Sequence, residues 1–124
     1  MLEQETLIPV SIFKKELGCF ESVVKYLKEN KSFTITKIAS LTRRDKSTIS
    51  ITYSKAKKKH PKQFKKNHKI KIPLSAIHKE GNILGNIILY LYQDKLLSIN
   101  DISKILSRSY QTIWITFTKR RDFK

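Results

Sequence analysis

The side chains best suited to chemistry in this 124-residue chain are its cations. Lysine and arginine together number 26 against 10 acidic residues, so the formal net charge is +16. No Asp or Glu occurs between Lys46 and Lys79, and this interval contains eleven lysines. Because like charges repel one another in a compact chain, a polyanion is the natural partner. The composition therefore predicts a nucleic acid as the first candidate partner and an anionic membrane surface as the second.

Patterns for catalysis or cofactor binding do not occur in the sequence. The acidic residues show no acid–base or metal-ligand spacing, and the three histidines with the single Cys19 make no zinc motif. The three glycines form no phosphate-binding loop. We therefore expect no enzymatic activity, no metal and no cofactor.

Features of membrane or secreted proteins are also lacking. The longest apolar stretch, residues 83–92, is too short to cross a bilayer. The acidic N-terminus does not resemble a signal peptide. A lone cysteine excludes an internal disulfide and fits a reducing compartment. These features predict a cytoplasmic protein that makes no membrane contact.

The elements that position the cations are expected to occur twice. Aligning the chain with itself at an offset of 64 residues matches residues 8–60 with residues 72–124 without a gap, and 16 of the 53 pairs are identical. An internal duplication explains this register better than chance does. The sequence therefore predicts two repeats, residues 1–60 and 72–124, joined by a basic linker at residues 61–71.

Within each repeat the apolar residues recur every three or four positions, which indicates amphipathic helices. We expect one long helix followed by two short helices that a tight turn joins. The residues expected at the helix starts are Gly18, Thr34 and Asp45 in the first repeat and Asn82, Ser98 and Ser109 in the second. The third helix would bury Ile49, Tyr53 and Ala56, or Ile113 and Phe117. The fold class is thus predicted to be all-α, with two tandem three-helix units.

The Ile-Pro segments that open the repeats are compatible with two structures. Pro9 and Pro73 could occupy the first position of a helix, or the segments could form short extended straps. The sequence leaves both open.

The two short helices of each repeat form a helix-turn-helix pattern. It covers ITKIASLTRRDKSTISITYSKAKKK at residues 35–59 and INDISKILSRSYQTIWITFTKRR at residues 99–121. In the common pattern a small residue of one helix packs on a branched apolar residue ten positions later, and Ala39 with Ile49 fits this spacing. The segments resemble region 4 of bacterial sigma factors and the LuxR-type regulators. The chain is also similar to small archaeal helix-turn-helix proteins built from repeated Ile-Pro-x-Ser-Ile-Phe units.

The resemblance implies that the third helix of each repeat enters a major groove of double-stranded DNA. In the first repeat the residues assigned to DNA are Arg43, Arg44, Lys46, Ser47, Thr48, Ser50, Ile51, Ser54, Lys55, Lys57, Lys58 and Lys59. In the second repeat they are Arg108, Ser109, Tyr110, Gln111, Thr112, Trp114, Thr118, Lys119, Arg120 and Arg121. The glycine that many such motifs place in the turn is Arg43 or Ser107 here.

Few of these side chains can read bases. Gln111 could pair with adenine, and isoleucine could touch a thymine methyl group. The arginines of the turn are better placed for phosphate. The mixture favours weak sequence specificity and a strong electrostatic term, as in a nucleoid architectural (chromatin) protein. A sequence-specific transcriptional regulator remains the alternative.

Three large apolar residues, Ile51, Trp114 and Ile115, are expected on the exposed side of the third helices. They would contact DNA, the sister repeat or a second subunit, so a homodimer or a docked protein partner is possible through them. An adaptor that docks on the transcription machinery is therefore a rival hypothesis. The acid-free linker could track phosphates, with Phe64 packed or inserted between bases, and RNA binding by the linker is a third hypothesis.

Overall fold

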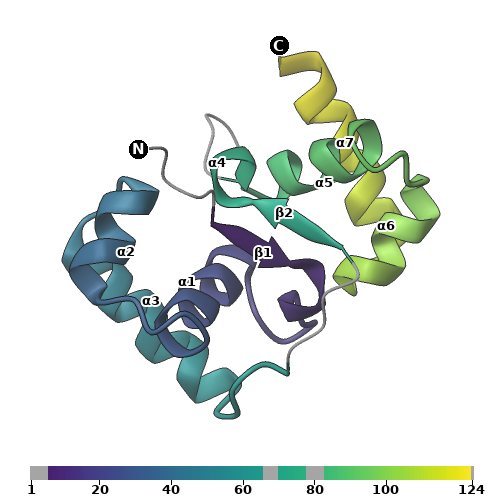
Figure 1. The fold of residues 1–124 in the computed structure, drawn as a ribbon. Coiled ribbons are helices and arrows are strands. Elements are labelled where there is room, and N and C mark those ends of the chain that lie inside the picture. The colour runs from purple at the N-terminus through teal and green to yellow at the C-terminus, as the bar shows by residue number, and fades with distance from the viewer. Residues whose placement is uncertain (1–5, 66–69, 78–82, 124) are drawn as a thin grey trace. The chain divides into compact units, whose positions relative to one another are not determined.

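The computed structural model describes residues 6–65, 70–77 and 83–123, with side chains as far as Lys119. This part of the chain is mostly helical, and it also contains a small two-stranded sheet (Figure 1). The expectation of an all-α protein is thus correct apart from the sheet. Among the described residues, the helices are too short or too polar to cross a membrane.

The chain divides into two compact units whose bounds differ from those expected. The first unit comprises residues 12–67, and the second comprises residues 1–11 together with residues 68–124. The expected linker, residues 61–71, is therefore shared between the two units and does not stand apart from them.

Three helices form the first unit. They are α1 (Cys19–Glu29), α2 (Ile35–Thr42) and α3 (Lys46–Lys59), and the short 3-10 helix η1 (Val10–Ile12) precedes them. The Gly18 amide donates to a Glu21 carboxylate oxygen at 2.9 Å, and the Thr34 hydroxyl accepts from the Lys37 amide at 3.1 Å. These contacts satisfy amide groups that the first turn of a helix leaves without partners. The starts expected at Gly18 and Thr34 are confirmed.

The second unit joins a sheet to four helices. Its elements are β1 (Leu7–Pro9), β2 (Lys71–Pro73), α4 (Leu74–Ile77), α5 (Ile83–Gln93), α6 (Ile99–Leu106) and α7 (Tyr110–Phe123). The strands pair antiparallel, with Ile8 opposite Ile72. Each Ile-Pro segment is therefore an extended strap followed directly by a helical turn, and the two straps bond to each other.

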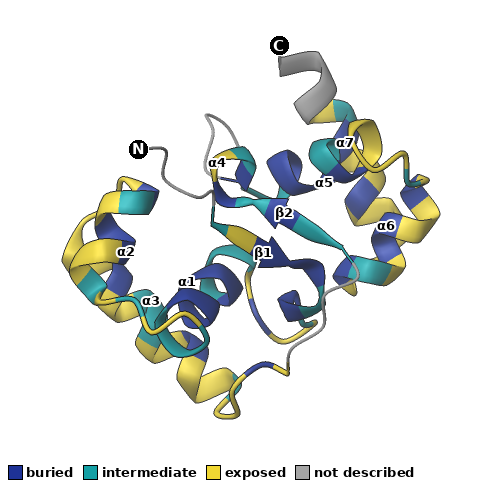
Figure 2. Cartoon of the chain, viewed as in Figure 1, coloured by how far each residue is buried: buried dark blue, intermediate teal, exposed yellow. Residues whose placement is uncertain are grey.

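The helix bounds of the two units correspond along the sequence. Helices α5, α6 and α7 begin and end 64 residues after α1, α2 and α3, respectively. The cores correspond as well, since each unit buries the inner face of its long helix against the two short helices (Figure 2). The fully buried residues include Val24, Leu27, Ile38 and Ile49 in the first unit and Ile88, Leu91, Ile102 and Ile113 in the second.

The turn between the two short helices contains a left-handed residue in each unit. Arg43 has φ 58° and ψ 43°, and Ser107 has φ 56° and ψ 42°. The amide that follows each of them donates to a carbonyl of the preceding helix, from Arg44 to Ala39 at 3.1 Å and from Arg108 to Ser103 at 3.0 Å. The left-handed conformation costs a residue other than glycine about 1 kcal/mol or more. The turn thus keeps a conformation that glycine usually provides, although glycine is absent.

Candidate nucleic-acid interface

Helix α3 uses one narrow side for packing and leaves the rest of its surface exposed. Ile49 and Ala56 are fully buried, and Tyr53 is half-buried. All twelve first-repeat residues assigned to DNA are exposed. They comprise two arginines of the turn, five lysines, and a group of serine, threonine and isoleucine side chains on α3. The burial of Ile49 and Ala56 places one face of α3 in the core, as the spacing predicts.

Several of these cations have partners within the first unit. The Lys59 ammonium group donates to both Glu21 carboxylate oxygens at 3.0 Å. Partial burial raises the pKa of Glu21, but the Gly18 amide and Lys59 outweigh it, so the pKa is below 4.5. Arg44 lies over the Phe20 ring at 5.4 Å, and Lys57 lies over the Tyr53 ring at 5.9 Å.

Four exposed cations remain uncommitted on this surface. Arg43, Lys46, Lys55 and Lys58 take part in none of the ion pairs found among the described residues. Their charges are therefore available to an anion without breaking an existing contact. Lys59, by contrast, would have to leave Glu21 first.

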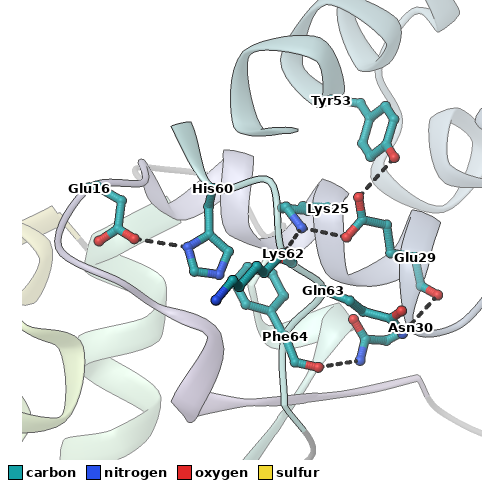
Figure 3. A network of polar contacts seen from close by, with 9 residues as sticks. All are labelled: Glu16, Lys25, Glu29, Asn30, Tyr53, His60, Lys62, Gln63 and Phe64. Atoms are coloured by element: carbon teal, nitrogen blue, oxygen red, sulfur yellow. Dashed lines mark hydrogen bonds and ion pairs between the residues drawn. The ribbon is translucent and has the colours of Figure 1, made fainter. Parts of the chain in front are cut away.

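A buried polar network that the sequence did not predict connects α1, α3 and the segment after α3 (Figure 3). At its centre the Lys25 side chain is fully buried and forms an ion pair with Glu29. Lys25 Nζ also donates to the Lys62 carbonyl at 2.7 Å, and the Tyr53 hydroxyl donates to Glu29 at 2.9 Å. Burial, and then the hydrogen bond to Glu29, raise the pKa of Tyr53.

The same network holds the beginning of the expected linker. Phe64 is 4% exposed, its ring lies 4.9 Å from Lys25 Nζ, and its carbonyl accepts from Asn30 Nδ2 at 3.0 Å. His60 stacks on Phe64, and its Nδ1 lies 2.9 Å from Glu16 Oε2. Residues 61–65 are thus fastened to α1 and are not a free strap, and Phe64 packs. Residues 66–69 of the linker lie outside the described residues.

The sequence carried one signal of this network. Lys25 aligns with Leu89 in the repeat, so a lysine stands where the other long helix has a leucine. An isolated lysine in an apolar position indicates a buried partner, because an unpaired buried charge is costly.

The α7 surface of the second unit is of a different kind. Tyr110, Trp114 and Ile115 are 51%, 44% and 51% exposed, respectively. Trp114 and Tyr92 both contact Phe117, with ring centroids 6.1 Å and 4.7 Å apart. This surface presents aromatic rings where α3 presents polar and cationic groups.

The other second-repeat residues assigned to DNA have mixed positions. Ser109, Gln111, Thr112 and Lys119 are exposed, whereas Arg108 and Thr118 are half-buried. The Ser109 hydroxyl accepts from the Thr112 amide at 3.1 Å and so caps α7 as expected. Arg108 Nη1 donates to the Leu106 carbonyl at 3.1 Å. The side chains of Arg120 and Arg121 lie outside the described residues.

The alignment of the repeats locates this difference. Lys28, Ser32, Lys46 and Ser50 of the first unit correspond to Tyr92, Leu96, Tyr110 and Trp114 of the second. The four second-unit residues are all at least 43% exposed. The two helical sets therefore share a backbone plan but offer different surface chemistry.

No group of three or more His, Cys, Asp or Glu side chains with the geometry of a metal site occurs among the described residues. No protein-family model, curated protein or solved structure matches the chain. The interface is accordingly argued from its own geometry.

Proposed function

We propose that the chain binds double-stranded DNA through two tandem helix-turn-helix units that arose by internal duplication. The common offset of 64 residues in sequence and in helix bounds supports the duplication. The left-handed residue of each turn supports the helix-turn-helix assignment. So does the burial of Ala39 with Ile49, and of Ser103 with Ile113, at the expected spacing of ten residues.

The observation that carries the proposal is the exposed surface of α3. An α-helix with its side chains fits the width of the major groove. Helix α3 lies on its own unit through Ile49 and Ala56, and the rest of its length is free to enter such a groove. Arg43 and Lys46 at its beginning, with Lys55 and Lys58 farther along, supply charges for phosphates on either side.

The same surface argues for weak sequence specificity. Asn and Gln, which pair with adenine, do not occur in α3, and its arginines are confined to the preceding turn. Serine hydroxyls accept many base edges, and Ile51 offers only a methyl contact. These features favour a nucleoid architectural protein. A sequence-specific regulator would need base reading from the second unit, where Gln111 is exposed.

Salt dependence of duplex binding tests the proposal. Four uncommitted cations in the first unit, with one or two more from the second, predict a log–log slope of roughly −4 to −6, from about −0.9 per phosphate contact. The measurement is fluorescence anisotropy with several unrelated labelled duplexes over a range of salt concentrations. Similar affinities for all duplexes support the architectural role, and one preferred sequence supports the regulator.

A matched pair of double variants separates a specific surface from net charge. Lys55→Gln/Lys58→Gln removes two α3 charges and should make the slope shallower by about two. Lys31→Gln/Lys62→Gln removes two exposed charges outside α3 and should leave the slope nearly unchanged. Equal effects of the two pairs would reject α3 as the interface. Tighter binding of single-stranded RNA than of duplex DNA would support the RNA hypothesis instead.

A second candidate function, an adaptor that docks on another protein, is favoured by one observation. The exposed aromatic residues of α7 resemble the anchors of protein interfaces more than a phosphate-binding surface. Loss of duplex binding on replacing Trp114 would place α7 on DNA, whereas unchanged binding would support the adaptor.

A further inference from the structure

The second unit carries an exposed apolar surface that DNA binding does not explain. We name Tyr92, Leu96, Tyr110 and Trp114 the aromatic surface. Their exposed fractions are 43%, 84%, 51% and 44%, respectively. Single exposed apolar residues are common, but four from adjacent elements usually mark a contact surface.

This surface contains both a projection and a hollow. The hollow has a volume of about 560 Å³ and is lined by Tyr92, Leu96, Leu97, Ser98, Ile99, Asn100 and Tyr110. Leu96 projects at its edge in the left-handed conformation, with φ 56°. The corresponding residue of the first unit, Ser32, has the same conformation, with φ 57°. The turn therefore places a leucine in solvent at an energetic cost, at a position where the first unit has a serine.

The charges near the aromatic surface are balanced, unlike those of the whole chain. Residues 92–110 contain three cations and two anions, whereas the corresponding residues 28–46 contain six cations and two anions. A surface that is nearly neutral is the place where two strongly basic molecules repel each other least.

Both signs of charge are exposed there. Asp94, Lys95, Asp101 and Lys104 are all exposed, and none takes part in an ion pair found among the described residues. In a symmetric contact the same surface meets itself, so an anion of one molecule can face a cation of the other.

We propose that the aromatic surface is a homodimer interface, in which Leu96 of one molecule packs into the hollow of a second molecule of this chain. The projection, the hollow and the two signs of charge lie on one surface, so the surface is complementary to itself. The dimer forms without DNA and does not rest on the proposed function. Because Tyr110 and Trp114 lie on α7, it would cover part of the α7 surface, and two chains would then supply two α3 helices to a duplex.

Sedimentation equilibrium of the full chain without DNA tests this proposal. We expect the average mass to rise with concentration from the 14.5 kDa of one chain towards twice that value. Leu96→Asn removes the projection but keeps a residue that tolerates the left-handed conformation, so the unit should stay folded. It should raise the dimer dissociation constant roughly ten- to hundredfold, as expected for loss of one buried leucine.

Ser32→Asn is the matched control, since it introduces the same residue into the same backbone conformation of the other unit. It should leave the dissociation constant unchanged. Trp114 is the chain's single tryptophan, so its emission should shift to shorter wavelength as the dimer forms. Higher salt should tighten the dimer by screening the net charge of the two molecules.

Two results would overturn the proposal. One is a single-chain mass at every concentration from micromolar to near-millimolar. The other is association that Leu96→Asn and Ser32→Asn affect equally, because the interface would then lie elsewhere. Circular dichroism of both variants verifies that each is folded.

Discussion

Replacing Glu29 by Gln is expected to destabilise the first unit by about 3 kcal/mol, because it leaves the buried Lys25 ammonium group without its carboxylate. The Lys25 side chain is fully buried, and after the change only the Lys62 carbonyl and the Phe64 ring remain near its charge. Removal of one member of a buried ion pair typically costs more than removal of both.

The reverse substitution should cost less. Lys25→Met leaves the Glu29 carboxylate, but that side chain is 14% exposed and still accepts from the Tyr53 hydroxyl. We therefore expect about 1 kcal/mol for Lys25→Met, which reflects a lost hydrogen bond to Lys62 more than a stranded charge. The double variant should be more stable than Glu29→Gln alone.

Urea denaturation monitored by circular dichroism measures these differences through the midpoint and the slope. Lys31→Met, at an exposed position, is the control and should stay within about 0.5 kcal/mol of the original chain. The argument fails if Glu29→Gln costs no more than Lys25→Met, since Lys25 would then not be the more deeply buried charge. Equal costs for the two singles and the double would likewise show that the pair does not act as a unit.

Two other predictions concern backbone conformation and pH. Arg43→Gly and Ser107→Gly should each raise the free energy of unfolding by about 1 kcal/mol, because glycine adopts the left-handed turn without strain, whereas Ser40→Gly in α2 should lower it by about as much. A loss of stability from either turn substitution in urea denaturation would contradict this reasoning. Glu21 has a folded-state pKa below 4.5, so it stabilises the fold above that pH, and this stabilisation disappears as the pH falls through the folded-state pKa. Glu21→Gln should thus lower the urea midpoint at neutral pH but not well below pH 4.5, and an equal decrease at both would exclude the ionic contribution.

The helices could be predicted because their signals are local. The apolar spacing around Val23, Val24 and Leu27 repeats at Ile87, Ile88 and Leu91, and it defines the inner face of each long helix. Capping side chains then mark where helices start. The Ser98 hydroxyl accepts from the Asp101 amide at 3.1 Å, as its position before an apolar run predicts. Asp45, however, precedes α3 without a side-chain capping bond.

The candidate DNA surface could be predicted in part. The exposure of α3 follows from its spacing of buried residues, so the first-repeat assignments were correctly placed on the surface. The commitments of individual cations could not be predicted. Glu21 and Lys59 are 38 residues apart in sequence, and only the packing of α1 against α3 brings them together.

The sequence by itself determined the doubled helical plan and the excess of positive charge, because helix periodicity, capping and charge depend on residue type and short-range spacing. Only the tertiary structure decided where the terminal segments belong. Strands β1 and β2 have three residues each, and their pairing of Ile8 with Ile72 joins residues 64 positions apart, so no short-range pattern encodes it. The same reason applies to Lys25, whose burial depends on partners from α1, α3 and the segment beyond α3, all of which must be in place before its charge is compensated.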